Sequence, residues 1–102
     1  MKLLLALVLS TLTSLSFAQA LLLDARTQAE FDSGHAQGAI LMPYDEVKTQ
    51  APMVLKDKNQ EIKVYCRSGN RAGKAVNTLK SLGYTNVTNI GGLDDARALQ
   101  VQ

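Results

Sequence analysis

One residue, Cys66, has a sequence context that could make a side chain chemically reactive. It is followed in order by Arg67, Ser68, Gly69, Asn70 and Arg71. Glycine and asparagine tolerate positive φ angles, so Gly69 and Asn70 would let the backbone N–H groups of this loop converge. Converging N–H groups at the start of a helix bind anions, and the anion here would be the sulfur of Cys66 or a sulfur species attached to it. The loop therefore predicts a nucleophilic thiolate.

The thiolate form of Cys66 needs more stabilisation than a helix end provides. A free thiol titrates near pH 8.5, and lowering its pKa to about 6.5 requires a preference of about 2.7 kcal/mol for the charged form. A helix N-terminus contributes at most about 2 kcal/mol. Arg67, Arg71 and direct N–H···S hydrogen bonds must supply the remainder. The two guanidinium groups also suit a doubly negative oxyanion, because each presents a planar fork of donors.

An isolated cysteine is often only a small buried apolar residue. A structural role, however, does not require a strand end, a Gly-Asn turn, a helix start and flanking arginines together. The combination favours a reactive Cys66. Because the chain contains no second cysteine, it can form no internal disulfide.

The elements on either side of the loop would hold Cys66 in place. Residues 62–65 form a β-rich run with Ile62 and Val64 on one face, so a strand delivers Cys66 at its carboxyl end. After the loop, apolar residues recur at helical spacing over residues 72–82, and Gly83 ends this helix.

The rest of the chain repeats this alternation of strand and helix. Further strands are predicted over residues 21–24, 39–42 and 87–90, and further helices over residues 27–33, 44–50 and 93–99. Thr27 and Glu30 have the spacing of a capping box at the first helix. The pattern predicts an α/β fold with a mostly parallel central sheet and helices on both faces. Ligands of such sheets bind at the carboxyl ends of strands, where Cys66 is expected.

The amino terminus has the layout of a secretory signal peptide. Lys2 precedes an apolar run over residues 3–9, and small and polar residues follow. The apolar run is shorter than the ~20 residues needed to span a bilayer. We expect residues 1–18 to be removed, with cleavage after Ala18 or Ala20, and residues 19–102 to form one domain. The mature protein would be periplasmic, without membrane association.

The charge distribution indicates a small anionic ligand. The formal net charge of +2 argues for neither nucleic acid nor a membrane surface. No carboxylate occurs over residues 62–93. The basic residues in this stretch are Lys63, Arg67, Arg71, Lys74 and Lys80. An anionic small molecule would find its best site there.

Three parts of the sequence resemble signatures of the rhodanese-like domain family. Residues 64–72, around Cys66, look like the active-site loop of that family. Residues 23–26, 30–31 and 34–40 look like its amino-terminal signature, and residues 82–84, 87 and 89–93 look like its carboxyl-terminal one. The resemblance implies a rhodanese-like fold and a sulfurtransferase that needs no metal or organic cofactor. We expect this protein to be a monomer.

The resemblance also implies a two-step reaction. Cys66 would attack the outer sulfur of thiosulfate, release sulfite and become a persulfide, which passes its sulfur to cyanide or a thiol. Carried over by position, Cys66 is catalytic. The substrate-binding residues are Arg67, Ser68, Gly69, Asn70 and Arg71. Related phosphatases and arsenate reductases of this fold place five residues between cysteine and arginine, whereas this loop has four, which favours sulfur over phosphate.

Two alternatives remain open at this stage. The same loop could hold sulfur for a partner protein as a carrier, without turning over thiosulfate. Asp24, Arg26 and His35 could be catalytic, but an ionised thiolate needs no general base. The i,i+4 spacing of Arg26 and Glu30 instead predicts a helix ion pair, and Asp24 ends a strand where its side chain can bond loop amides.

Overall fold

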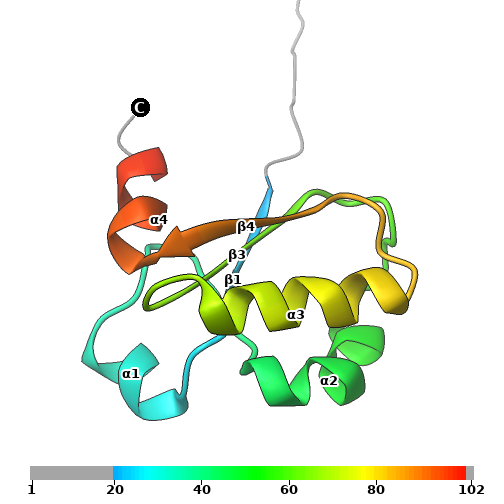
Figure 1. The fold of residues 1–102 in the computed structure, drawn as a ribbon, viewed down its shortest axis with the longest axis horizontal. Coiled ribbons are helices and arrows are strands. Elements are labelled where there is room, and N and C mark those ends of the chain that lie inside the picture. Colours follow the sequence, from blue (N-terminus) through cyan, green and yellow to red (C-terminus); the bar gives the residue numbers. More distant parts are fainter. Residues whose placement is uncertain (1–19, 101–102) are drawn as a thin grey trace, which may run out of the picture.

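The computed structural model describes residues 20–100 and contains a four-stranded sheet with helices packed against it (Figure 1). The strand order is β2-β1-β3-β4, and each neighbouring pair is parallel. The strands are β1 (Leu21–Asp24), β2 (Ile40–Leu41), β3 (Ile62–Cys66) and β4 (Val87–Gly92). The predicted α/β class with a parallel sheet is confirmed.

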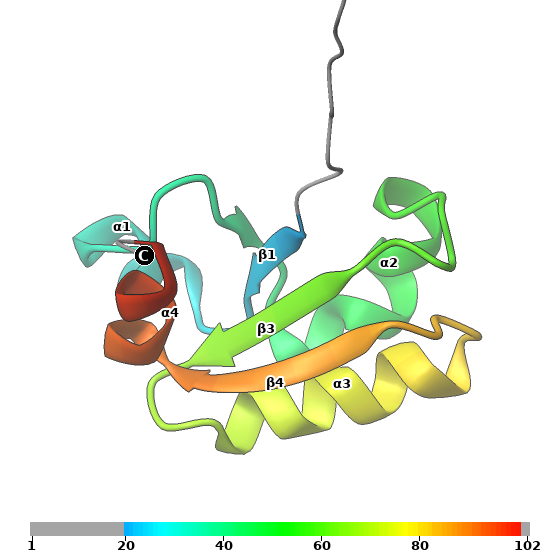
Figure 2. The ribbon, with the colours of Figure 1, turned by 90° about the horizontal axis from the view of Figure 1, so that it is seen from above.

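Helices cover the two faces of the sheet unequally. They are α1 (Gln28–Ser33), the 3-10 helix η2 (Tyr44–Glu46), α2 (Val47–Val54), α3 (Asn70–Ser81) and α4 (Leu93–Gln100). In Figure 1, α2 and α3 lie below the sheet and α4 lies above it, which Figure 2 shows from above. The prediction of helices on both faces is therefore confirmed.

The larger core lies between the sheet and the pair α2 and α3. The apolar face of α3 contributes Ala72, Ala75, Val76 and Leu79, all buried, as their helical spacing predicted. The smaller core lies on the α4 face and is built around three buried residues, Ala36, Tyr65 and Ala96. Both cores contact β3, so the strand that carries Cys66 is packed on both sides.

The second helical region is longer than the sequence indicated. A helix was predicted over residues 44–50, but the chain forms η2 and then α2, which continues through Pro52 to Val54. Pro52 has no N–H to donate to the carbonyl oxygen of Lys48, four residues earlier in the helix. Lys48 is exposed. Water can satisfy that carbonyl, while the buried Ala51 anchors this part of α2 to the core.

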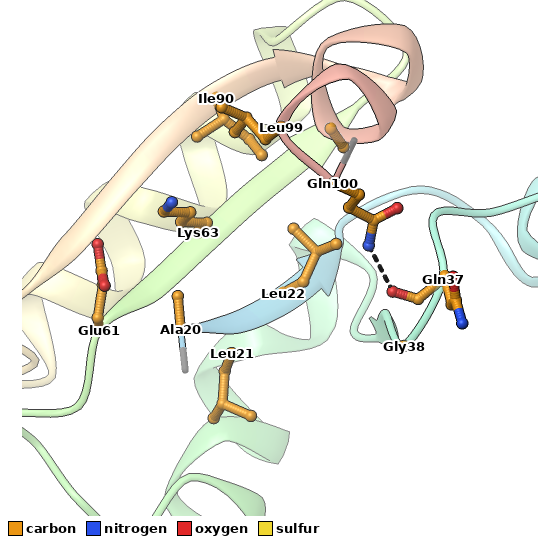
Figure 3. A pocket seen from close by; sticks show the side chains of 11 residues that line it. Ala20, Leu21, Leu22, Gln37, Gly38, Glu61, Lys63, Ile90, Leu99 and Gln100 are labelled. Atoms are coloured by element: carbon orange, nitrogen blue, oxygen red, sulfur yellow. Dashed lines mark hydrogen bonds between the residues drawn. The ribbon is translucent and has the colours of Figure 1, made fainter. Parts of the chain in front are cut away.

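An open hollow of about 850 Å³ lies on the α4 face, toward the amino-terminal ends of the strands (Figure 3). The short α4 covers only the carboxyl ends of the strands, so the side chains of Leu22, Lys63 and Ile90 line this hollow. None of residues 66–71 contributes to it. The hollow is thus separate from the cysteine loop.

The predicted signal peptide lies outside the described residues. Within residues 20–100, no helix combines the length and the apolar character that crossing a membrane requires.

Candidate active site

Cys66 is the last residue of β3, and the loop after it curves back over the sulfur. Gly69 has a φ of +101°, in the left-handed region, and its N–H donates to Sγ of Cys66 over 2.9 Å. Only Gly69 supplies the positive φ expected here. Asn70 was predicted to share this role, but it is already the first residue of α3. Because the helix starts there, the loop turns within residues 67–69.

Main-chain donors favour the ionised form of the Cys66 sulfur, although the residue is only 1% exposed. Burial raises the pKa of the thiol, but hydrogen bonds from backbone N–H groups outweigh this effect and hold the pKa below its ordinary value. These donors belong to Ala72, Ser68, Gly69 and Arg71. The cradle expected from the sequence is therefore present, and it extends one residue further into α3, to the N–H of Ala72.

Alkylation as a function of pH should reveal this lowered pKa. We expect the rate with iodoacetamide to reach half its maximum at a pH below the ~8.5 of a free thiol, because the thiolate is the reacting form. In urea-unfolded protein the half-point should return to about 8.5. Burial slows the maximal rate, so the half-point is the quantity to compare. Equal half-points in the folded and unfolded protein would contradict the cradle.

The end of β4 contacts the backbone of the cysteine loop at Gly69 and Arg67. Asn89 Nδ2 donates to the carbonyl oxygen of Gly69 over 2.9 Å, and the N–H of Gly91 donates to Asn89 Oδ1 over 2.9 Å. At Gly92 a Cβ atom would lie 2.3 Å from the carbonyl oxygen of Arg67, so only glycine fits there. The sequence assigned no role to these residues, although glycines within a strand, as at Gly91 and Gly92, indicate close approach of another backbone.

A β-bulge brings this end of β4 beside the loop. Val64 pairs with Asn89, but Tyr65 pairs with Gly91 and Cys66 with Gly92. Ile90 is therefore an extra residue without a partner in β3.

A carboxylate from a distant part of the chain lies beside the cysteine loop, although residues 62–93 contain none. Glu30 of α1 accepts two hydrogen bonds from the guanidinium of Arg71, from Nη1 to Oε1 over 2.7 Å and from Nη2 to Oε2 over 3.0 Å. Glu30 Oε1 also accepts from the backbone N–H of Thr27, in the capping box that was predicted. The expected helix pair between Arg26 and Glu30 is wrong, because Arg26 precedes the first turn of α1.

Because of this ion pair, the two arginines of the loop differ in exposure and in how closely they contact Glu30. Hydrogen bonds from Arg71 and then from Thr27 hold the pKa of Glu30 far below its usual range, so the carboxylate is ionised. Glu30 in turn raises the pKa of Arg71. The side chain of Arg67 is 80% exposed, and its Nη2 lies 3.6 Å from Glu30 Oε2. Of these two arginines, Arg67 has the guanidinium that is more exposed to solvent. Arg71 contacts the Cys66 sulfur through its backbone N–H, while its guanidinium is bound to Glu30.

Asp24, Arg26 and Tyr65 form a buried network beside the cysteine. Arg26 Nε and Nη2 donate to the carboxylate of Asp24, and the hydroxyl of Tyr65 donates to Asp24 Oδ2 over 2.7 Å. The N–H of Ala36 donates to the hydroxyl oxygen of Tyr65. The network ties the end of β1 to the residue before Cys66, which is a structural role.

His35 and the remaining loop side chains lie at the surface. The ring of His35 stacks on Phe31 with a centroid distance of 3.7 Å, which agrees with a structural role. Ser68 and Asn70 are exposed, and Ser68 faces the sulfur through its N–H. Among residues 20–100, no cluster of three His, Cys, Asp or Glu side chains could hold a metal ion.

One family of known proteins matches this chain over most of its length. A family model described as Rhodanese-like domain matches residues 9–98. The chain belongs to this family of rhodanese-like sulfurtransferases. A solved structure, described as rhodanese with anions from E. coli, superimposes with a TM-score of 0.72 at 40% identity and covers 76% of this chain and 91% of its own. The predicted rhodanese-like fold is confirmed.

Named relatives differ in how much of their length this chain spans. The thiosulfate sulfurtransferase PspE of Escherichia coli is 42% identical over 73 residues, which cover 72% of this chain and 70% of PspE. The tRNA uridine(34) hydroxylase of Sodalis glossinidius is 37% identical over 78 residues, but the match covers 22% of that protein. The putative sulfur carrier protein YrkF of Bacillus subtilis is 33% identical over 69 residues, which cover 36% of it.

Proposed function

We propose that this protein is a thiosulfate sulfurtransferase that carries sulfur on Cys66. The thiolate attacks the outer sulfur of thiosulfate, the bond between the two sulfur atoms breaks, and sulfite leaves with the bonding electron pair. The product is a Cys66 persulfide anion. Cyanide then attacks the outer sulfur of the persulfide, which forms thiocyanate and returns the thiolate. A thiol acceptor, as its thiolate, would attack the same sulfur and leave as a persulfide, which also returns the Cys66 thiolate.

The observation that carries this proposal is the set of N–H groups directed at one sulfur. A group of main-chain donors around Cys66 can stabilise the thiolate before the reaction and the persulfide anion after it. The exposed guanidinium of Arg67 supplies a contact for the sulfonate oxygens of the donor. The substrate-binding role proposed for Ser68, Gly69, Asn70 and Arg71 rests on the shape and the amides of the loop.

Two facts favour thiosulfate as the donor. A relative that this chain resembles over most of its described length is a thiosulfate sulfurtransferase. The loop is also small and cationic at Arg67, which suits a small oxyanion. A second candidate is a carrier that receives sulfur from a partner protein, and the similarity to a putative sulfur carrier keeps it open.

The mass of the intact protein after incubation with thiosulfate tests the proposal. We expect a gain of one sulfur atom, about 32 Da, and no gain in protein whose Cys66 is first alkylated with iodoacetamide. Continuous sulfite release with cyanide as acceptor then separates an enzyme from a carrier. Failure of the unblocked protein to gain mass would reject direct use of thiosulfate.

The proposed setting of this activity is the periplasm, after removal of residues 1–18, with the domain acting as a monomer. The amino-terminal pattern of one lysine, an apolar run and small residues supports export.

A further inference from the structure

Glu30 places a permanent negative charge beside the loop that receives the sulfur donor. We propose that Glu30 determines donor specificity, by disfavouring doubly charged donors such as thiosulfate relative to singly charged donors such as alkanethiosulfonates. The inference rests on the proposed function, since it concerns the donor of that reaction.

The geometry sets the carboxylate close to the path of the donor. Glu30 is bonded to both nitrogen atoms at the end of Arg71, so the positive charge of Arg71 is compensated. Glu30 Oε2 is also 3.6 Å from Nη2 of Arg67. A donor oxyanion bonded to Arg67 through a hydrogen bond of about 3 Å would therefore lie within about 7 Å of the carboxylate. At that distance the two negative charges repel each other.

The magnitude of this repulsion depends on the charge of the donor. Coulomb energy is proportional to the product of the charges, so a dianion is disfavoured twice as strongly, in free energy, as a monoanion. At about 7 Å and near-aqueous screening, one unit of donor charge corresponds to about a threefold change in affinity, and two units to about tenfold. A purely structural role of Glu30 would not depend on donor charge.

Two donors that deliver the same sulfur isolate this effect. Thiosulfate gives its outer sulfur to the Cys66 thiolate and leaves as sulfite, a dianion. Methanethiosulfonate gives its terminal sulfur to the same thiolate and leaves as methanesulfinate, a monoanion. Both reactions yield the Cys66 persulfide anion, and cyanide converts that persulfide to thiocyanate in both cases. In such a two-step mechanism the kcat/KM of the donor reports the first step alone.

The test compares Glu30→Gln with Glu30→Asp. Glutamine keeps an oxygen that can accept from Thr27 and Arg71, and it satisfies a capping box as glutamate does. Glu30→Gln should raise kcat/KM about tenfold for thiosulfate and about threefold for methanethiosulfonate, mainly through KM, so the ratio of the two donors shifts about threefold. Glu30→Asp loses reach but keeps the charge, and it should leave the ratio within about 1.5-fold of wild type. Asp32→Asn, which removes one charge from the exposed side of α1, should also leave the ratio unchanged.

The outcomes separate this inference from the proposed function. Turnover of both donors with an unchanged ratio in Glu30→Gln would overturn the inference alone. A ratio that shifts equally in Glu30→Asp would assign the effect to packing and would overturn it as well. If wild-type protein uses neither donor, the proposed function fails and this inference fails with it.

Discussion

Cys66→Ser should lower kcat/KM for thiosulfate, measured as thiocyanate formation, by at least about 10⁴-fold. A serine oxygen is protonated at neutral pH and cannot hold sulfur as a persulfide. Serine still offers an acceptor to the N–H of Gly69, so the fold should survive, and urea unfolding can verify this. Lys80→Ala, a change on the exposed side of α3, should keep wild-type activity.

A residual rate within about tenfold of wild type in Cys66→Ser would place the nucleophile elsewhere. Because Cys66 is the only cysteine, no other thiol could take over, and the proposed chemistry would have to be abandoned.

Asp24→Ala should cost about 3–5 kcal/mol of unfolding free energy. The substitution leaves the guanidinium of Arg26, a side chain with 7% exposure, without its carboxylate partner. It also removes the acceptor of the Tyr65 hydroxyl. Urea unfolding at pH 7 measures the effect as a lower midpoint with an unchanged slope.

Tyr65→Phe is the matched control for this network. It removes one hydroxyl but leaves the ion pair between Asp24 and Arg26, so we expect a loss of only about 1–2 kcal/mol. Equal losses in the two variants would mean that the buried ion pair itself contributes little.

Local features of the site could be predicted from the sequence because they lie within one short segment. The strand end, Cys66, the turn at Gly69 and the helix that follows are contiguous, and each has its own propensity signal. The apolar spacing of α3 likewise predicted its buried face. For the same reason the α/β class followed from the alternation of short strands and helices.

Contacts between distant segments could not be predicted in this way. Glu30 and Arg71 are 41 residues apart, and they meet because β1 pairs with β3, which places the segments after these strands side by side. Spacing alone suggested Arg26 as the partner of Glu30, but that choice required a helix that began two residues earlier. Asn89 reaches Gly69 across 20 residues for a similar reason, through the pairing of β3 with β4.

The unpaired Ile90 makes the number of residues in β4 part of the geometry around the sulfur. Losing one residue between Val87 and Gly92 would restore a regular ladder but move Asn89 or the glycines away from the loop backbone they support. A substitution at an exposed position such as Thr88 would leave the number of residues between Val87 and Gly92 unchanged. Divergence in this strand should therefore proceed by exchange of side chains and not by insertion or deletion.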